Sequence, residues 1–158
     1  MPIIIEGPDG AGKSTLAAKL AKRLDLNILK MTANGGQSVV EYCQKLDCDG
    51  IVIDRCWISE QIYADIFGRK QRLDDEYCEM LTDLCFTAGI PIVVVLPPLH
   101  EVIKRLTQRG DEFGDVVIKN IEEIYCRYEA WIDEHPRCVL VTDNGVTECM
   151  EGVLKCML

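Results

Sequence analysis

The chain has 158 residues, of which 48% are hydrophobic and 27% are charged, an ordinary composition for one globular domain with its own core. Its formal net charge of −9 at pH 7 argues against a broad nucleic-acid-binding surface. No apolar run approaches the ~20 residues of a membrane-spanning helix. We therefore expect a single cytoplasmic domain over residues 1–158 that binds neither a membrane nor nucleic acid.

The first predicted strand, residues 3–5, runs directly into a phosphate-binding loop. Residues 7–14 match the pattern G-x-x-x-x-G-K-[ST], and an amphipathic helix is predicted immediately afterwards, at 14–24. Lys13 would contact the β- and γ-phosphates, and the hydroxyl of Ser14 would be a ligand of Mg²⁺. We therefore expect ATP and Mg²⁺ as cofactors. The loop residues expected to hold them are Gly7, Gly10, Ala11, Gly12, Lys13, Ser14 and Thr15.

The rest of the chain alternates helices with short apolar strands. Further strands are predicted at 27–31, 51–54, 91–96 and 138–142. Further helices are predicted at 38–46, 57–67, 74–88, 99–109, 116–134 and 146–156. This alternation is typical of a parallel sheet with right-handed crossover connections. We therefore predict an α/β three-layer sandwich, in which a five-stranded parallel sheet lies between helices.

Two groups of charged residues are expected to complete a phosphate site beside the loop. Asp54 ends a buried strand, at the edge of a parallel sheet where ligands bind, and it would hold a water on Mg²⁺ or orient Arg55. Arg55 would form a bidentate contact with an acceptor phosphate. Arg105 and Arg109 stand four residues apart on one predicted helix face, from which they would reach the transferring phosphates. Ordinary surface salt bridges are the structural alternative at both places.

The helix predicted at 57–67 begins just after the Asp54 strand end and mixes aromatic, acidic and basic residues. An aromatic side chain there would stack on a nucleotide base, although core packing is an equally good explanation for Tyr63. We count Trp57, Tyr63 and Arg69, together with Arg55, as candidate substrate-binding residues.

Nine cysteines are many for this length, but their spacing does not indicate a zinc site. The sequence contains no C-x-x-C, and neither His100 nor His135 stands at a ligand spacing from a cysteine. An odd number of cysteines in a nucleotide-binding chain is typical of reduced thiols in a cytosol. We expect most of them to be small buried apolar residues.

Taken together, these motifs resemble those of thymidylate kinases, in the same order and over most of the chain. The resemblance is carried by the phosphate loop with Asp9, by Asp54-Arg55, by Gly68-Arg69, and by Arg109-Gly110 after the Val94–Pro98 strand end. It implies a P-loop nucleotide kinase fold, a single domain with a short lid near residues 105–116, and a homodimer as a candidate assembly.

The resemblance also implies roles for individual residues. Asp9 would lie among the cofactor-binding residues and orient the reacting phosphates or the acceptor. Lys13 and Ser14 would hold the ATP phosphates and Mg²⁺. Arg55 would bind the phosphate of the acceptor. Arg105 and Arg109 would correspond to the arginines near the lid, and they would close over the donor.

Deoxynucleoside kinases are the near alternative, because the arginine pair and the stretch 121–131 also resemble them. Those enzymes need a carboxylate base after the second strand to deprotonate a sugar hydroxyl. Residues 27–37 contain no Asp or Glu, which favours an acceptor that is already an ionised phosphate. Glu6 is the nearby candidate base for the alternative. The short segment at 32–50 fits a compact relative of these families, such as a phage-encoded enzyme of the host cytoplasm.

The sequence therefore predicts a nucleoside monophosphate kinase. It would transfer the γ-phosphoryl group of ATP to a small-molecule acceptor, dTMP or a related pyrimidine deoxynucleotide. The alternatives are a deoxynucleoside kinase that phosphorylates a 5′-hydroxyl, a nucleotide-binding module without turnover, and a kinase of another small metabolite.

Overall fold

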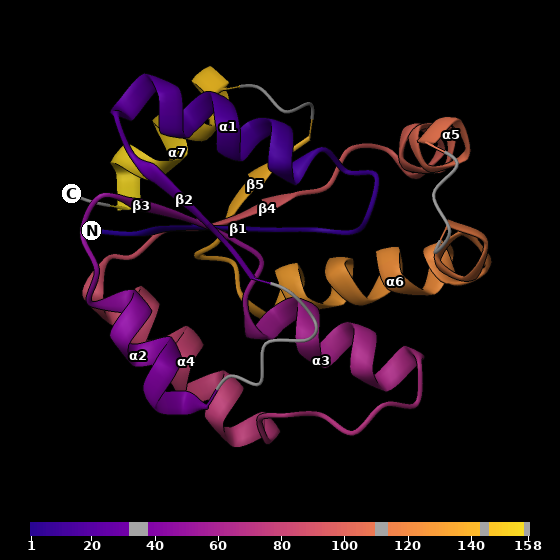
Figure 1. The fold of residues 1–158 in the computed structure, drawn as a ribbon, viewed down its shortest axis with the longest axis horizontal. Helices are drawn as coiled ribbons and strands as arrows, with labels where there is room; N and C mark the ends of the chain where they lie inside the picture. The colour runs from indigo at the N-terminus through magenta and orange to yellow at the C-terminus, as the bar shows by residue number, and fades with distance from the viewer. Residues whose placement is uncertain (32–37, 110–113, 143–145, 157–158) are drawn as a thin grey trace.

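Parallel strand pairing organises the fold. In the computed structural model, which describes residues 1–31, 38–109, 114–142 and 146–156, five strands form one parallel sheet in the order β2–β3–β1–β4–β5 (Figure 1). The strands are β1 (Ile3–Glu6), β2 (Asn27–Lys30), β3 (Ile51–Asp54), β4 (Ile92–Val95) and β5 (Val139–Val141). The helices are α1 (Lys13–Leu24), α2 (Val39–Leu46), α3 (Trp57–Ile66), α4 (Asp75–Ala88), α5 (Leu99–Arg109), α6 (Gly114–Glu134) and α7 (Val146–Cys156). The predicted α/β sandwich is therefore confirmed.

Helices cover both faces of the sheet and enclose two cores. Figure 1 shows α1 and α7 on one side of the sheet and α2, α3, α4 and α6 on the other. Because alternate residues of a strand point to opposite faces, Ile3 and Ile5 of β1 join the core under α1 and α7, whereas Ile4 joins the larger core on the other face. Burial on both faces explains why β1, β3 and β4 appear in the sequence as apolar runs, whereas the edge strand β2 is mostly exposed.

The carboxyl ends of three neighbouring strands carry polar residues at one edge of the sheet. β1 lies between β3 and β4, with Ile5 opposite Asp54, and Lys30 at the end of β2 is also opposite Asp54. Glu6 is the last residue of β1. After β1 the chain forms β2 and β3 on one side of it and then crosses to β4 on the other side. Such a switch in strand order is where open α/β sheets bind ligands.

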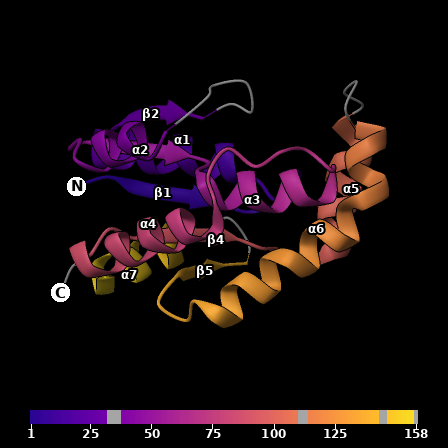
Figure 2. The same ribbon diagram turned by 90° about the horizontal axis from the view of Figure 1, so that it is seen from below.

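The predicted boundaries differ from the observed ones by only a few residues. Helix α6, for example, begins at Gly114, and it lies beside both α3 and α5 (Figure 2). Within the described ranges, no helix is both long enough and apolar enough to cross a membrane. Residues 32–37 of the short segment at 32–50, and part of the lid predicted near 105–116, lie outside the described residues. The lid therefore stays a prediction.

The packing of α7 on the sheet predicts the effect of one substitution. A Cβ added to Gly152 would stand 2.3 Å from Cγ1 of Val139 on β5. Alanine is favoured over glycine inside a helix by ~1 kcal/mol, so helix propensity alone would make Gly152→Ala stabilising. We expect it instead to lower the free energy of unfolding by about 1–3 kcal/mol, because the new methyl group overpacks the core.

Urea denaturation of the Gly152→Ala protein measures this change. Adding Val139→Ala to the same chain should recover part of the loss, because it removes the atoms that the new methyl group meets. A Gly152→Ala protein as stable as the wild type would show that α7 does not depend on this close contact.

Candidate functional site

The phosphate loop connects β1 to α1 and is packed tightly against its neighbours. A Cβ on Gly7 would stand 2.3 Å from the carbonyl oxygen of Val95, and one on Gly10 would stand 2.8 Å from Cγ of Leu106. Both glycines also have positive φ angles, +138° and +78°, which other residues rarely adopt. The loop is therefore held in shape between β4 and α5, next to the N-terminus of α1, where backbone N–H groups can meet phosphate.

Lys13 is buried inside this loop. Its side chain donates a hydrogen bond of 2.7 Å to the carbonyl oxygen of Pro8, and the residue is only 5% exposed. Burial lowers the pKa of Lys13 to about 7, the charge of Arg55 acts in the same direction, and the surrounding carboxylates oppose the shift. A phosphate placed beside this side chain would favour its protonated form.

Ser14 and Asp54, the two predicted magnesium ligands, are in contact. The hydroxyl of Ser14 donates to Oδ2 of Asp54 at 2.7 Å. Asp54 is 2% exposed, and its buried Oδ1 accepts no hydrogen bond from any described residue. An unpaired buried carboxylate oxygen is costly. Because hydroxyl and carboxylate oxygens are the ligands that Mg²⁺ prefers, these two residues fit the ion.

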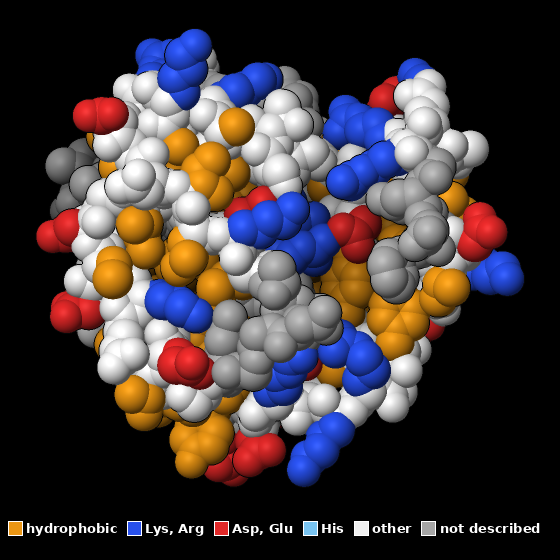
Figure 3. All heavy atoms as spheres, viewed as in Figure 1, with side chains coloured by type: hydrophobic (Ala, Val, Ile, Leu, Met, Phe, Trp, Pro, Cys, Tyr) orange, Lys and Arg blue, Asp and Glu red, His pale blue; other side chains and the backbone are white. Residues whose placement is uncertain are grey.

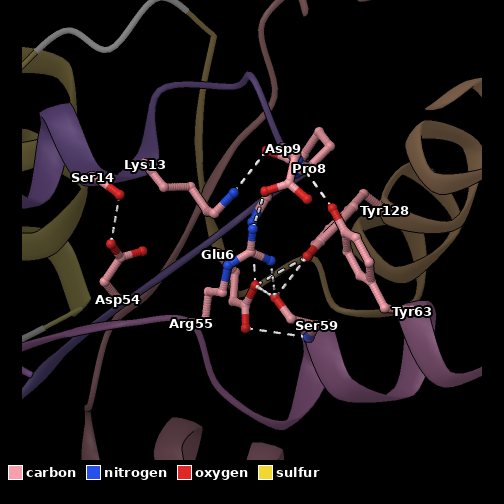
Figure 4. A network of polar contacts seen from close by, with 11 residues as sticks. Glu6, Pro8, Asp9, Lys13, Ser14, Asp54, Arg55, Ser59, Tyr63 and Tyr128 are labelled. Carbon is pink, nitrogen blue, oxygen red and sulfur yellow. Dashed lines mark hydrogen bonds and ion pairs between the residues drawn. The ribbon is translucent and has the colours of Figure 1, made fainter. Parts of the chain in front are cut away.

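Arg55 extends from the turn after β3 toward the phosphate loop (Figure 4). Its guanidinium forms an ion pair with Asp9, donates to Oγ of Ser59 at 3.4 Å, and lies 5.4 Å from the centre of the Tyr63 ring. The N–H of Asp9 in turn donates to the hydroxyl of Tyr63 at 3.0 Å. Burial alone would raise the pKa of Asp9, but the charges of Arg55 and Lys13 and the hydrogen bond with Tyr63 lower it. Asp9 is therefore a paired carboxylate.

Helix α5 brings two further arginines to the loop. Arg105 donates to the carbonyl oxygen of Ala11 at 3.0 Å, and both Arg105 and Arg109 line the cavity above the loop. Their spacing on one helix face, as expected from the sequence, lets both side chains point the same way. They add positive charge where the phosphates of a nucleotide would lie.

Two cavities meet beside the loop. The loop cavity, of about 360 Å³, is lined by the phosphate loop, the start of α1 and the two arginines of α5. The α3 cavity, of about 340 Å³, is lined by residues that include Tyr42, Ser59, Glu60, Tyr63, Arg69 and Arg72. Asp9, Lys30 and Arg55 line both. Figure 3 shows Lys and Arg side chains gathered around the middle of this face.

The candidate substrate-binding residues divide into two kinds. Arg55, Tyr63 and Arg69 line the α3 cavity. Trp57 lines neither cavity: it is 1% exposed, its Nε1 donates to the hydroxyl of Thr82 at 3.0 Å, and its ring packs edge-on against Tyr42. Trp57 therefore supports the wall of the α3 cavity from behind.

Lys30 and Arg72 were not predicted from the sequence, and Glu60 was expected only as one of the mixed residues of the helix predicted at 57–67. Lys30 lines both cavities, and Glu60 forms ion pairs with Arg69 at 3.6 Å and with Arg72 at 3.9 Å in the α3 cavity. The rule that found Asp54, a polar residue at the end of a strand, would also find Lys30 once the pairing of β2 with β3 is known. Arg72 follows α3, and no sequence motif could have identified it.

Comparison with known proteins identifies a relative. No model of a known protein family matches the chain. The prophage-derived YorR protein of Bacillus subtilis is 35% identical over 130 residues, which cover 78% of each chain. The crystal structure of YorR in complex with phosphorylated GDP has a TM-score of 0.77. That alignment covers 99% of this chain and 95% of YorR, with 25% identity over this longer stretch.

More distant structures show the same fold. Deoxyadenosine kinase from M. mycoides with bound dATP has a TM-score of 0.66 at 16% identity, covering 98% of this chain and 99% of the kinase. The same enzyme with bound dCTP gives 0.61 at 17%, covering 98% and 100%. The predicted nucleotide kinase fold is thereby confirmed, whereas the particular likeness to thymidylate kinases stays a prediction. By its 35% identity over most of both sequences, the chain belongs to the same family as YorR of Bacillus subtilis.

Proposed function

We propose that this protein is a nucleoside monophosphate kinase that transfers the γ-phosphoryl group of ATP to a deoxynucleoside monophosphate. The observation that carries the proposal is the meeting of two cavities at Asp9, Lys30 and Arg55. One cavity contains the phosphate loop that a donor nucleotide needs. The other opens beside it and is lined with cationic side chains, as a second nucleotide needs. Phosphoryl transfer requires two substrates that are held together at one such point.

On this proposal, each side chain acts through charge and position. Lys13, Arg105 and Arg109 would neutralise the phosphates of ATP, and Arg55 would fix the acceptor phosphate. Ser14 and Asp54 would hold Mg²⁺, which when bound supplies further positive charge to the phosphate oxygens. Asp9 would orient the reacting groups from its position at the junction of the cavities.

The carboxylates of the site support an acceptor that is already ionised. Among the described residues, Asp9 is paired with Arg55, Glu60 is flanked by two arginines, and Glu6 is fully buried and surrounded by donors. Asp9 and Glu6 are therefore not free to remove a proton from a sugar hydroxyl, and Asp54, which bonds to Ser14, is assigned to Mg²⁺. Glu60, whose Oε1 accepts no hydrogen bond from any described residue, is the candidate base for a nucleoside acceptor. A phosphate acceptor needs no such base, and the stretch 27–37 contains no Asp or Glu.

For the acceptor base, we propose dTMP or a related pyrimidine nucleotide, on the strength of the motifs that resemble thymidylate kinases. A deoxynucleoside kinase is the second candidate, favoured by the fold that the chain shares with deoxyadenosine kinase. The phosphorylated GDP in the YorR structure makes guanine nucleotides a necessary comparison. The prophage origin of YorR supports a site of action in the cytoplasm of a bacterial host.

ADP release from ATP and Mg²⁺ over a panel of acceptors tests the function. The panel holds dTMP, dUMP, 5-substituted dUMPs, dGMP, dAMP and dCMP, each with its nucleoside. We expect a monophosphate to turn over while its nucleoside does not. Turnover of a nucleoside would instead establish the second candidate. Tight ATP binding without ADP release for any acceptor would indicate a binding module.

Replacement of Arg55 should lower the catalytic efficiency for the acceptor more than it lowers that for ATP. We expect Arg55→Ala to lower kcat/KM for the monophosphate about 10²-fold, because one preorganised donor to the reacting phosphate is lost. The matched control is Arg127→Ala, since Arg127 is half exposed and paired with Asp65 at 2.7 Å outside both cavities. It should keep wild-type kinetics. A loss in Arg55→Ala confined to the KM for ATP would contradict this assignment.

Binding of ATP should weaken as the pH rises above neutrality. Lys13 has a pKa of about 7 in this structure, and bound phosphates favour its protonated form, so binding takes up a proton above that pH. Affinity should fall by up to about tenfold per pH unit in this range. Calorimetry in buffers of different ionisation enthalpy measures both quantities. Lys13→Met should bind more weakly and without this slope; an equal slope in that variant would show that another group takes up the proton.

A further inference from the structure

Glu6, the last residue of β1, is a buried carboxylate that lines neither cavity. Its side chain is fully buried, and five donors surround it. They are the N–H of Gly7 at 3.3 Å, the N–H of Cys56 at 2.5 Å, the N–H of Ser59 at 3.3 Å, the hydroxyl of Ser59 at 2.5 Å and the hydroxyl of Tyr128 at 3.0 Å. A carboxylate removed from water is stable only with such partners.

The donors come from three separate parts of the site, and Figure 4 shows two of the donor residues, Ser59 and Tyr128. Gly7 begins the phosphate loop, Cys56 and Ser59 lie in the turn and first residues of α3, and Tyr128 lies on α6. Burial raises the pKa of Tyr128, so its hydroxyl stays protonated and can donate. Through this one carboxylate, therefore, the phosphate loop is linked to the segment that carries Arg55.

Glu6 also acts as the N-terminal cap of α3. Cys56 occupies the N-cap position of α3 and makes no side-chain capping hydrogen bond. The carboxylate of Glu6 accepts instead from the N–H groups of Cys56 and Ser59, which are otherwise unpaired at a helix start. The negative charge also suits the positive end of the helix dipole.

This cap stands directly beside Arg55, whose backbone is unusual. Arg55 has a φ of +77°, in the left-handed region that residues other than glycine rarely adopt. Its own N–H donates to the carbonyl oxygen of Ile5 at 2.9 Å, and the next N–H, that of Cys56, is held by Glu6. The hydroxyl of Ser59 donates to Glu6 and accepts from the guanidinium of Arg55 at 3.4 Å. Both the backbone and the side chain of Arg55 are thus linked to Glu6.

We propose that Glu6 is a positioning residue for the acceptor half of the reaction. It holds the turn after β3 so that Arg55 points its guanidinium at the junction of the two cavities, and it touches neither substrate. This inference rests on the proposed function, in which Arg55 binds the acceptor phosphate. It also assigns to Glu6 a role other than the general base that a deoxynucleoside kinase would require.

Glu6→Gln is the informative substitution, because it keeps the size of the side chain and removes one acceptor oxygen. The amide nitrogen would then face a backbone N–H or a hydroxyl that needs an acceptor. We expect kcat/KM for the monophosphate acceptor to fall 10- to 100-fold and the KM for ATP to change less than twofold. Ser59→Ala removes the hydroxyl link to Arg55 but keeps the backbone hydrogen bonds to Glu6, so its effect on the acceptor should be in the same direction and smaller.

A double-mutant cycle shows whether Glu6 acts through Arg55. If it does, Glu6→Gln should lower kcat/KM for the acceptor little further when Arg55→Ala is already present. The control for lost stability is Thr82→Val, which removes a buried hydroxyl on α4 that bonds to Trp57 and leaves the Glu6 contacts intact. It should lower the melting temperature without changing kcat/KM for the acceptor more than it changes the KM for ATP.

Three kinetic results would overturn the proposal. In one, the two substitutions in the cycle have additive effects. In another, Glu6→Gln changes the kinetic constants for the acceptor and for ATP to the same extent, in proportion to the stability that the protein loses. In the third, kcat falls with KM unchanged and the acidic limb of the pH profile is lost, which would make Glu6 a base.

A crystal structure of Glu6→Gln gives a readout that does not depend on turnover. We expect Arg55 to leave the left-handed region and to lose its ion pair with Asp9. An unchanged Arg55 would contradict the positioning role even if the protein proved to have a different acceptor. Conversely, a displaced Arg55 in a protein that phosphorylates no monophosphate would leave the positioning role intact and would refute only the proposed function.

Discussion

The buried carboxylate of Glu6 is the constraint on which the site depends. Its donors belong to the phosphate loop, to the turn after β3 and to α6, and a carboxylate without water keeps its partners close. The loop carries the residues proposed to bind ATP, the turn carries Arg55, and α6 packs beside α5, the helix of Arg105. The relative positions of the charged groups are therefore set from inside the molecule, where solvent does not compete for the same hydrogen bonds.

Around this constraint, cations and carboxylates alternate at the carboxyl edge of the sheet. Lys13 and Arg55 lie close to Asp9, and Asp54 lies close to Ser14. The whole chain is acidic, with a net charge of −9, yet the loop cavity is lined by several Lys and Arg side chains. A local positive field is sufficient to hold phosphates, whereas a long nucleic-acid backbone needs a broad one.

The family and the fold limit the chemistry without deciding the acceptor. The chain shares a family with YorR and a fold with deoxyadenosine kinase, and one fold can serve several acceptors. The choice between a nucleoside and its monophosphate depends on whether a carboxylate is free to accept a proton. In the described residues the engaged state of Asp9 and Glu6 favours the monophosphate, whereas Glu60 keeps one oxygen without a hydrogen bond.

The sequence by itself determined the features that short stretches encode. The phosphate loop is a contiguous motif, the strands are apolar runs, and Asp54-Arg55 follows one of them, so their place at one edge could be predicted. The contacts between distant residues required the tertiary structure. Tyr128 meets Glu6 across 122 residues, and the buried position of Trp57 depends on how α3 packs against α4. No local pattern encodes such contacts, because they arise only when separate elements of the chain pack together.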